Sequence, residues 1–221
     1  MKPSTGPSTT SEARVEENDG SLIIQNASLL GRHGLWNITI VDGIIRSMNL
    51  IDELDHSVHS LGTNNIIDAA SCTVIPGLVD AHVHLDKCFL LDHCHAKRGD
   101  FQEAVSETLA AKSAFTYKDV TDRARRLIEY EISFGTTLMR THVEVDPIIG
   151  LVSLEAILSL RKEYERLITI QVAIFAQDGI TNQSGQVEMM RTALKMGEIS
   201  IYLNLLHTSS YSIELSQRLD D

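Results

Sequence analysis

The sequence is poor in basic side chains and in long apolar runs. Its 19 Lys and Arg residues stand against 30 Asp and Glu residues, which gives a formal net charge of −11. Such a charge opposes binding to nucleic acid, because the phosphate backbone needs basic partners, and it opposes binding to an anionic membrane surface. No apolar run approaches the roughly 18 residues of a membrane-spanning helix. We therefore expect neither nucleic acid nor a membrane among the partners of this protein.

Cysteine is scarce as well, with Cys72, Cys88 and Cys94 making up the total of three. An odd count without zinc-ribbon spacing argues against a disulfide framework and against a structural zinc site. The first twenty residues, MKPSTGPSTTSEARVEENDG, lack the apolar core of a secretory signal. These features predict a protein of the reducing cytoplasm.

What the sequence does contain falls into four segments. Residues 1–19 are rich in Ser, Thr, Pro and Glu, and we expect a disordered tail there. Residues 20–73 have the pattern of a small β-rich module, with Asp42-Gly43 between two apolar runs as a hairpin signal. Residues 74–198 alternate strand-like and helical patterns, and residues 199–221 begin with a candidate fourth strand, ISIYLNLL.

The alternation within residues 74–198 predicts an α/β fold with a parallel sheet and right-handed crossovers. Strands are expected at Thr136–Val145 and at Leu167–Phe175, and the second is a continuous apolar run of the kind buried on both faces. Four helices are expected: Glu103–Phe115, one capped by Thr116 and ended by Gly135, one capped by Ser153, and one over about Gln186–Met196. No dinucleotide-binding or P-loop motif follows any strand. This order of elements does not by itself separate a closed barrel from an open sheet.

The most informative stretch is TVIPGLVDAHVHLDKC, from Thr73 to Cys88. If it forms a strand, His82 and His84 point to the same side, together with Asp80 and Asp86. Two imidazoles placed in this way can bind one divalent metal ion. The alternative is two unrelated histidines on a polar strand face. His93, Cys94 and His95, and also His207, are interpreted as loop residues without a ligand role.

The motif PGLVDAHVHLDK resembles the signature of the amidohydrolase superfamily of metal-dependent hydrolases, and its HVHLDK form is similar to the cytosine deaminase-like branch. The resemblance implies an N-terminal β-sandwich part followed by an incomplete (β/α)8 TIM-type barrel of about three and a half to four β/α units. It also implies that His82 and His84 bind one divalent metal ion, zinc or iron, which activates water for attack on a ring carbon that bears an amine.

Two later motifs, RTHVEV and AQDG, also look like their counterparts in cytosine deaminase-like enzymes. The resemblance implies that Gln177 hydrogen-bonds a nitrogen heterocycle, a pyrimidine or a triazine, since an amide offers both a donor and an acceptor. For His142, lining of the substrate pocket, a supporting contact and a role in core packing all stay open. The products would be a ring carbonyl and ammonia or an amine.

The resemblance covers about residues 20–197, and the family's remaining catalytic motifs, a Glu, further His residues and an Asp, do not occur in this sequence. No catalytic residue is therefore assigned, and we expect a truncated fragment of a longer hydrolase that does not turn over cytosine. The alternatives are an amidohydrolase acting on N-alkyl aminotriazines, a non-catalytic half-barrel interaction protein that pairs with itself or with a longer copy, and an open α/β binding module in which the two histidines are incidental.

Overall fold

The computed structural model describes residues 20–51, 65–92, 94, 97–177, 179–180, 183–197 and 199–201. The chain divides into two compact units, residues 1–76 and residues 77–221. The tail predicted for residues 1–19 and most of the segment 199–221 lie outside the described residues. In the described part, no helix has both the length and the apolar character needed to cross a membrane.

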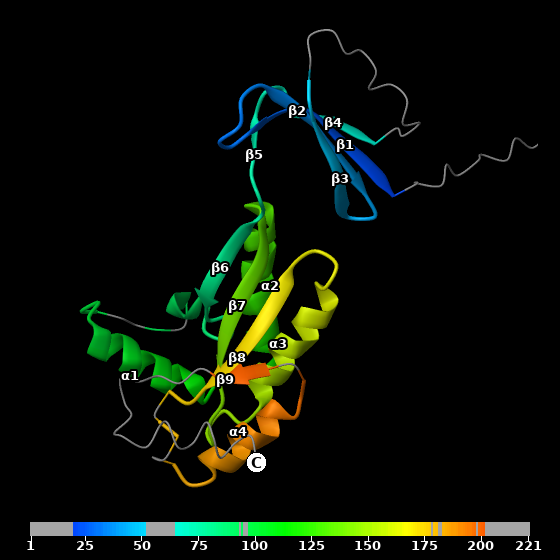
Figure 1. Ribbon diagram of the computed structural model, residues 1–221. Coiled ribbons are helices and arrows are strands. Elements are labelled where there is room, and N and C mark those ends of the chain that lie inside the picture. Colours follow the sequence, from blue (N-terminus) through cyan, green and yellow to red (C-terminus); the bar gives the residue numbers. More distant parts are fainter. Residues whose placement is uncertain are drawn as a thin grey trace, which may run out of the picture. The chain divides into compact units, whose positions relative to one another are not determined.

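The first unit contains one five-stranded sheet, coloured blue to cyan in Figure 1. Its strands are β1 (Ser21–Leu29), β2 (Leu35–Val41), β3 (Ile44–Leu50), β4 (Ile66–Asp68) and β5 (Thr73–Val74). The strand order is β3-β2-β1-β4, and β5 also pairs with β1. The strand β1 runs antiparallel to β2 but parallel to β4 and β5.

The predicted hairpin is confirmed, since Asp42 and Gly43 connect β2 to β3. Both residues have positive φ, 52° and 74°, as a two-residue type I′ turn requires. In this unit the sheet buries Ile23, Ala27 and Ile38.

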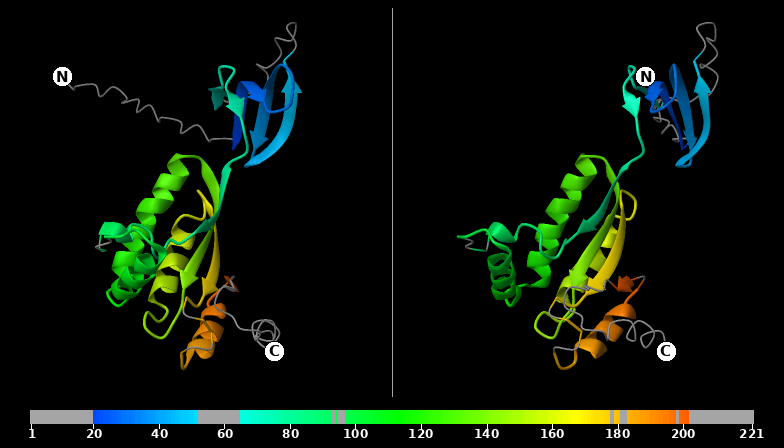
Figure 2. Two further views of the ribbon diagram at one scale, coloured as in Figure 1. Left: turned by 90° about the vertical axis from the view of Figure 1, so that its left-hand side faces the viewer. Right: turned by 60° about the vertical axis from the view of Figure 1, so that its left-hand side comes forward.

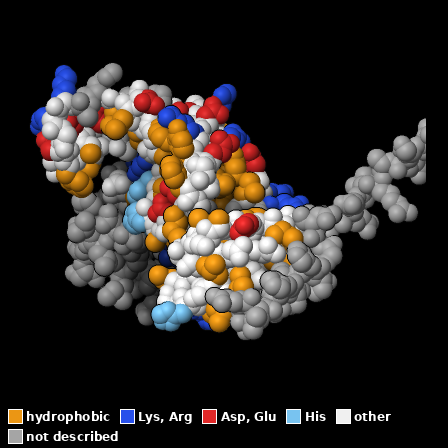
Figure 3. Space-filling view, turned by 90° about the horizontal axis from the view of Figure 1, so that it is seen from above, with side chains coloured by type: hydrophobic (Ala, Val, Ile, Leu, Met, Phe, Trp, Pro, Cys, Tyr) orange, Lys and Arg blue, Asp and Glu red, His pale blue; other side chains and the backbone are white. Residues whose placement is uncertain are grey.

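Apolar side chains of the first unit remain on its surface. Among them are Ile44, Ile45, Met48, Leu50, Ile66 and Ile67, all between 42% and 57% exposed. Hydrophobic side chains also form patches on the face of the molecule drawn in Figure 3. A sandwich requires a second sheet over such a surface, and the described residues of this unit form a single sheet, so the predicted sandwich is not confirmed.

The second unit is a four-stranded parallel sheet with helices in the connections (Figures 1 and 2). The strands are β6 (Leu78–Val83), β7 (Thr136–Glu144), β8 (Thr169–Phe175) and β9 (Ile199–Ile201), paired in that order. The connections contain α1 (Phe101–Lys112), α2 (Tyr117–Ser133), α3 (Val152–Glu163) and α4 (Gln186–Leu194). The predicted α/β alternation is therefore confirmed, and the four strands follow one another as expected.

Alternation along the strands separates a helix-covered face from a second, more polar face. On β7, Met139 and Val143 belong to the core that also contains Val120 and Ile128 of α2. Successive side chains on a strand point to opposite faces, so His142, next to Val143, lies on the other face. The helix layer thus packs against one side of the sheet and leaves the histidine side for the site described below.

Two details of the sequence prediction are wrong. Ser153 does not cap α3: the helix begins at Val152 after Leu151, and Ser153 lies inside its first turn. The strand β8 is not buried on both faces either, since Thr169 and Gln171 are exposed. These two side chains share the face on which Phe175 lies, so the helix-covered side alone is continuously apolar.

The remaining boundaries agree within a few residues. Thr116 is the N-cap of α2, and its side chain accepts a hydrogen bond from the Asp119 backbone N–H, as the capping pattern predicts. Gly135 follows α2 with φ of 90°, the left-handed conformation that suits glycine after a helix. The helix expected at Glu103–Phe115 is observed as α1, shifted toward its N-terminus by two to three residues.

Candidate functional site

Three histidines lie together where β6 and β7 end. His82 is the second-to-last residue of β6, and His84 follows the strand directly. Their ring centroids are 5.3 Å apart, and the ring of His142 on β7 stacks on that of His82 at 4.1 Å. The expectation that His82 and His84 point the same way agrees with this geometry, and the parallel pairing of β6 with β7 adds His142 to the cluster.

His84 is oriented through one of its ring nitrogens. Its Nδ1 lies 2.9 Å from the backbone carbonyl oxygen of His142. A carbonyl can only accept, so Nδ1 carries the proton and donates it, which leaves the Nε2 lone pair available. Metal-binding histidines are commonly held in this way by a carbonyl on the opposite nitrogen. The donor chemistry of His84 therefore fits a metal ion.

His142 differs from its neighbours in burial. It is 3% exposed, and burial, with the nearby His82 and His84, lowers its pKa to about 4. Its imidazole is therefore neutral at physiological pH. The described residues contain no set of three or more His, Cys, Asp or Glu side chains placed to hold one metal ion.

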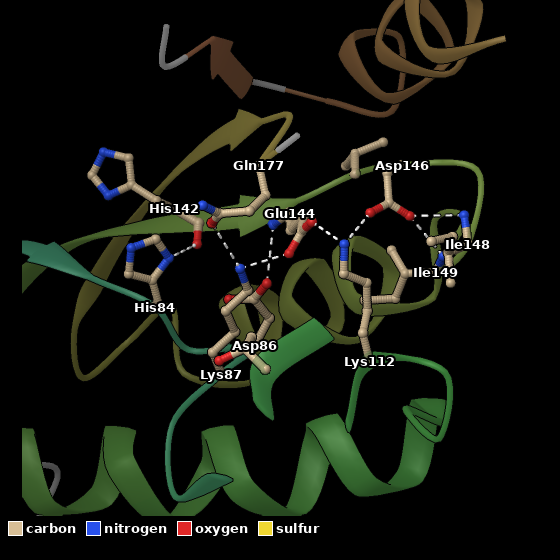
Figure 4. Close-up of polar contacts among 12 residues, drawn as sticks. His84, Asp86, Lys87, Lys112, His142, Glu144, Asp146, Ile148, Ile149 and Gln177 are labelled. Atoms are coloured by element: carbon tan, nitrogen blue, oxygen red, sulfur yellow. Dashed lines mark hydrogen bonds and ion pairs between the residues drawn. The ribbon is translucent and has the colours of Figure 1, made fainter. Parts of the chain in front are cut away.

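A lysine lies beside the histidines. Lys87, three residues after His84, forms an ion pair with Glu144 at 2.6 Å between Nζ and Oε2. The same ammonium donates to Oε1 of Gln177 at 3.3 Å. Figure 4 shows Lys87 between these two side chains, which come from β7 and from the turn after β8. Lys87 thus connects residues from three consecutive strand ends.

Glu144 also forms an ion pair with a second lysine. Lys112, at the end of α1, is 2% exposed and donates to Oε1 of Glu144 and to Oδ2 of Asp146. Burial would lower the pKa of Lys112, but its hydrogen bonds to Asp146 and Glu144 outweigh that effect and raise it. Asp146 in turn accepts the backbone N–H groups of Ile148 and Ile149. The result is a buried chain of alternating charge, Lys87–Glu144–Lys112–Asp146.

The carboxylate of Asp86 holds β6 and β7 together near the site. It is fully buried, and its Oδ2 accepts the backbone N–H of Glu144 at 3.0 Å. On the same loop, burial raises the pKa of the Cys88 thiol to about 12. A thiol protonated at physiological pH is a poor nucleophile, so the chemistry of this region rests on its imidazole, amide, carboxylate and ammonium groups.

A pocket of about 200 Å³ opens next to these groups. Its polar side consists of His84, Lys87, Glu144 and Gln177, and its other side is the helix α1. Of the residues expected to act, the structure therefore brings His84 and Gln177 into one pocket, and places His82 and His142 in the adjoining histidine cluster. Their roles in metal and substrate binding stay predictions.

The sequence reasoning missed Lys87 and Lys112. Lys87 could have been noticed, because it is part of the HVHLDK motif and follows His84 closely. Lys112 gave no such signal, because its partners Glu144 and Asp146 are 32 and 34 residues away. Of the predicted loop residues, His93, His95 and His207 lie outside the described residues.

Comparisons with known proteins give the family. No protein-family model matches the chain. The N-isopropylammelide isopropyl amidohydrolase of Pseudomonas sp. (strain ADP) is 33% identical over 189 residues, which are 81% of this chain and 44% of that protein. The fold is similar to that of 5-methylcytosine deaminase from Klebsiella pneumoniae, with a TM-score of 0.78, 26% identity, and coverage of 90% of this chain and 49% of the other.

A third relative agrees with these two. The N-isopropylammelide isopropylaminohydrolase of Burkholderia multivorans has a TM-score of 0.65 and 26% identity, over 80% of this chain and 43% of the other. The chain therefore spans about half the length of the relatives it matches. Those relatives are hydrolases and deaminases that act on carbon–nitrogen bonds. Sequence and fold together show that this chain belongs to the amidohydrolase superfamily.

Proposed function

We propose that this chain takes part in the metal-dependent hydrolysis of a carbon–nitrogen bond on a nitrogen heterocycle, a pyrimidine or a triazine. The observation that carries the proposal is the position of His84, at once a member of the histidine cluster and a wall of the pocket that contains Gln177 and Lys87. A metal held by the histidines would then lie next to a ring bound in the pocket. The relatives named above act on rings of this kind.

His82 and His84 are the residues that would hold the metal, which we take to be zinc or iron. The imidazole nitrogen is a good ligand for both ions, and His84 already has its Nδ1 engaged by the His142 carbonyl. When bound, such an ion supplies Lewis acidity and lowers the pKa of water into the neutral range.

The pocket residues would bind and orient the ring. The Gln177 amide offers a donor and an acceptor to adjacent ring atoms, and its Oε1 is held by Lys87. Lys87 is itself held by Glu144, so its ammonium group would be fixed in a position from which it can donate to a ring carbonyl. His142, neutral because of its burial, would close the site behind His82 without adding a charge.

The architecture follows from the same proposal. The four parallel strands would form part of a (β/α)8 barrel, in which functional groups gather at the C-terminal strand ends. The sheet of the first unit would form part of a β-sandwich. A cytoplasmic location accords with the free thiols of Cys72, Cys88 and Cys94.

Metal binding is the first test. The purified full chain is titrated with Zn²⁺ or Fe²⁺, and bound metal is measured by inductively coupled plasma mass spectrometry after gel filtration. We expect the double variant His82→Ala/His84→Ala to lose the bound metal, whereas the control His33→Ala, an exposed histidine of the first unit, keeps it. Equal metal content in both variants contradicts the proposed metal site.

Ring binding is the second test. With Zn²⁺ present, binding of 5-methylcytosine and of N-isopropylammelide is measured by calorimetry or by saturation-transfer NMR, and release of ammonia or isopropylamine is followed separately. We expect Gln177→Ala to weaken ring binding about tenfold, since removal of one partner of a polar contact costs about 1–3 kcal/mol. Binding that is unchanged in Gln177→Ala contradicts the role of this residue.

A further inference from the structure

The helix α1 is unusual in what it buries. Glu103 and Lys112, both charged, are its buried side chains. Phe101, Val105 and Leu109 are 72%, 36% and 45% exposed, respectively. A surface helix normally turns its apolar residues toward the core, whereas α1 leaves them uncovered.

Polar contacts at both ends keep α1 in place. At its start, the Glu103 carboxylate accepts the backbone N–H groups of Lys97, Arg98 and Gly99 at 2.6 to 2.8 Å. At its end, Lys112 is bound to Glu144 and Asp146 of the β7 region. These polar contacts fix the orientation of the helix at both of its ends.

The uncovered residues face the candidate site. Phe101, Val105 and Leu109 are spaced four residues apart, which places them on one side of the helix. All three line the pocket whose opposite side is formed by His84, Lys87 and Gln177. The pocket thus has one polar wall, suited to a ring with nitrogen and oxygen atoms, and a wall on α1 in which these three apolar residues stand beside Ala104, Thr108 and Lys112.

We propose that this apolar wall, Phe101, Val105 and Leu109, recognises a small alkyl substituent on the heterocycle, so that the pocket selects alkyl-substituted rings over unsubstituted ones. The proposal rests on the function proposed above and names its substrate class. At about 200 Å³ the pocket is smaller than the ~300–1,000 Å³ of pockets for drug-sized ligands. It therefore suits one ring with a compact substituent. Both kinds of relative carry such a group in their substrates' names, a methyl or an isopropyl group.

The geometry also assigns separate tasks to the two walls. The polar side chains hold the ring and would bind substituted and unsubstituted rings alike. The apolar wall adds the free energy of covering the alkyl group, about 0.8 kcal/mol for each buried carbon. One methyl group therefore corresponds to a preference of about fourfold, and an isopropyl group to a preference well above tenfold.

Two matched pairs of probes test the proposal: cytosine with 5-methylcytosine, and ammelide with N-isopropylammelide. Their dissociation constants are measured on the full chain in the presence of Zn²⁺, for wild type and for the variants Phe101→Ala and Leu109→Asn. We expect the wild type to prefer each alkylated ring by the factors given above. In both variants the preference should fall toward one.

Phe134→Ala is the matched control. Phe134 is an aromatic residue with a similar exposure, 76%, and it follows α2 away from the pocket lining. Its replacement should leave the preference unchanged. The wall variants should remain folded, because substitutions of exposed side chains rarely change stability much, and circular dichroism checks this.

Three results would overturn the proposal, and they are distinguishable. An alkyl preference that persists in both wall variants refutes the recognition of the alkyl group by the apolar wall but leaves the proposed function intact. If the wild type binds none of the four rings, both the proposed function and the recognition of an alkyl group by the apolar wall are refuted. Bound rings without an alkyl preference, together with a dimer that dissociates in Phe101→Ala, identify α1 as a contact with a second copy of the chain.

Discussion

Lys112 connects α1 to the sheet through two buried carboxylates. Its replacement by Ala would leave Glu144 and Asp146 without this partner in a buried place. Breaking a buried ion pair in this way costs about 3–5 kcal/mol, so we expect a drop of that size in the free energy of unfolding, measured by urea denaturation.

The control for Lys112 is Lys118→Ala. The Lys118 side chain is 84% exposed and pairs with Asp122 on the surface of α2. Such surface pairs contribute about 0.2–1 kcal/mol. Equal losses in the two variants would show that burial adds nothing to the Lys112 contacts.

Glu103 makes the segment before α1 sensitive to acid. Its three backbone hydrogen bonds, with that from Lys97 the largest cause, lower its pKa below the ordinary value. The carboxylate therefore stabilises the segment above the unfolded-state pKa of about 4.3, and the stabilisation is lost as the pH falls through the lowered folded-state pKa.

Hydrogen exchange measures this effect directly. We expect the amides of Lys97, Arg98 and Gly99 to be protected at neutral pH and to lose protection below about pH 4. In Glu103→Gln they should be weakly protected at both pH values, because a neutral amide accepts more weakly than a carboxylate. Protection factors that are the same in both proteins would exclude the carboxylate as the cause.

At the scale of single residues, sequence reasoning succeeds where partners are close along the chain. His82 and His84 fall on one side because strand side chains alternate with a period of two. The Lys112 contacts could not be foreseen, since they depend on how α1 packs against β7. The same limit applies to Lys87 and Gln177, which are 90 residues apart and meet through the order of strands in the sheet.

At the scale of elements, α2 is held by its apolar side. Ile128 is fully buried in the core between α2, α3 and β7. We expect Ile128→Ala to reduce the free energy of unfolding by about 2–5 kcal/mol, through lost burial and the cavity left behind. Leu167→Ala, at a residue 63% exposed, should change it by less than about 0.5 kcal/mol. Similar losses in both variants would contradict the packing of α2 described above.

A helix or strand can be predicted where the sequence around it contains local signals, such as a capping residue or a regular apolar period. The helix α2 has a 3.6-residue apolar period, a Thr116 cap and a terminal glycine, and it was found almost residue for residue. The start of α3 was not, since Leu151 precedes it without any side-chain cap and the nearby Ser153 is misleading. The exposed face of β8 was missed because Thr169 and Gln171 look like minor interruptions in an apolar run.

At the scale of the whole molecule, β6 is an edge strand. It is the first strand of the sheet, and among the described strands only β7 pairs with it. Leu78 and Val79 on this strand are 47% and 62% exposed. Exposed apolar edge strands favour pairing with another chain, so we expect the protein to self-associate as its concentration rises.

Light scattering coupled to gel filtration tests this expectation. Val79→Lys should shift the protein toward the monomer, because a charged side chain at an edge opposes pairing. Ile148→Lys, at a loop residue 54% exposed, serves as the control and should behave as the wild type does. A wild-type protein that stays monomeric over a hundredfold range of concentration would refute self-association through β6.

The polar contacts that hold α1 in place determine which residues of this site can be varied. Because Glu103 and Lys112 hold the helix, the exposed apolar residues on its pocket side can be exchanged at little cost to folding. New side chains at positions 101, 105 and 109 would reshape the pocket while His82, His84 and the sheet stay as they are. A library randomised at these three positions is therefore the natural starting point for redirecting the proposed pocket toward rings with larger or more polar substituents.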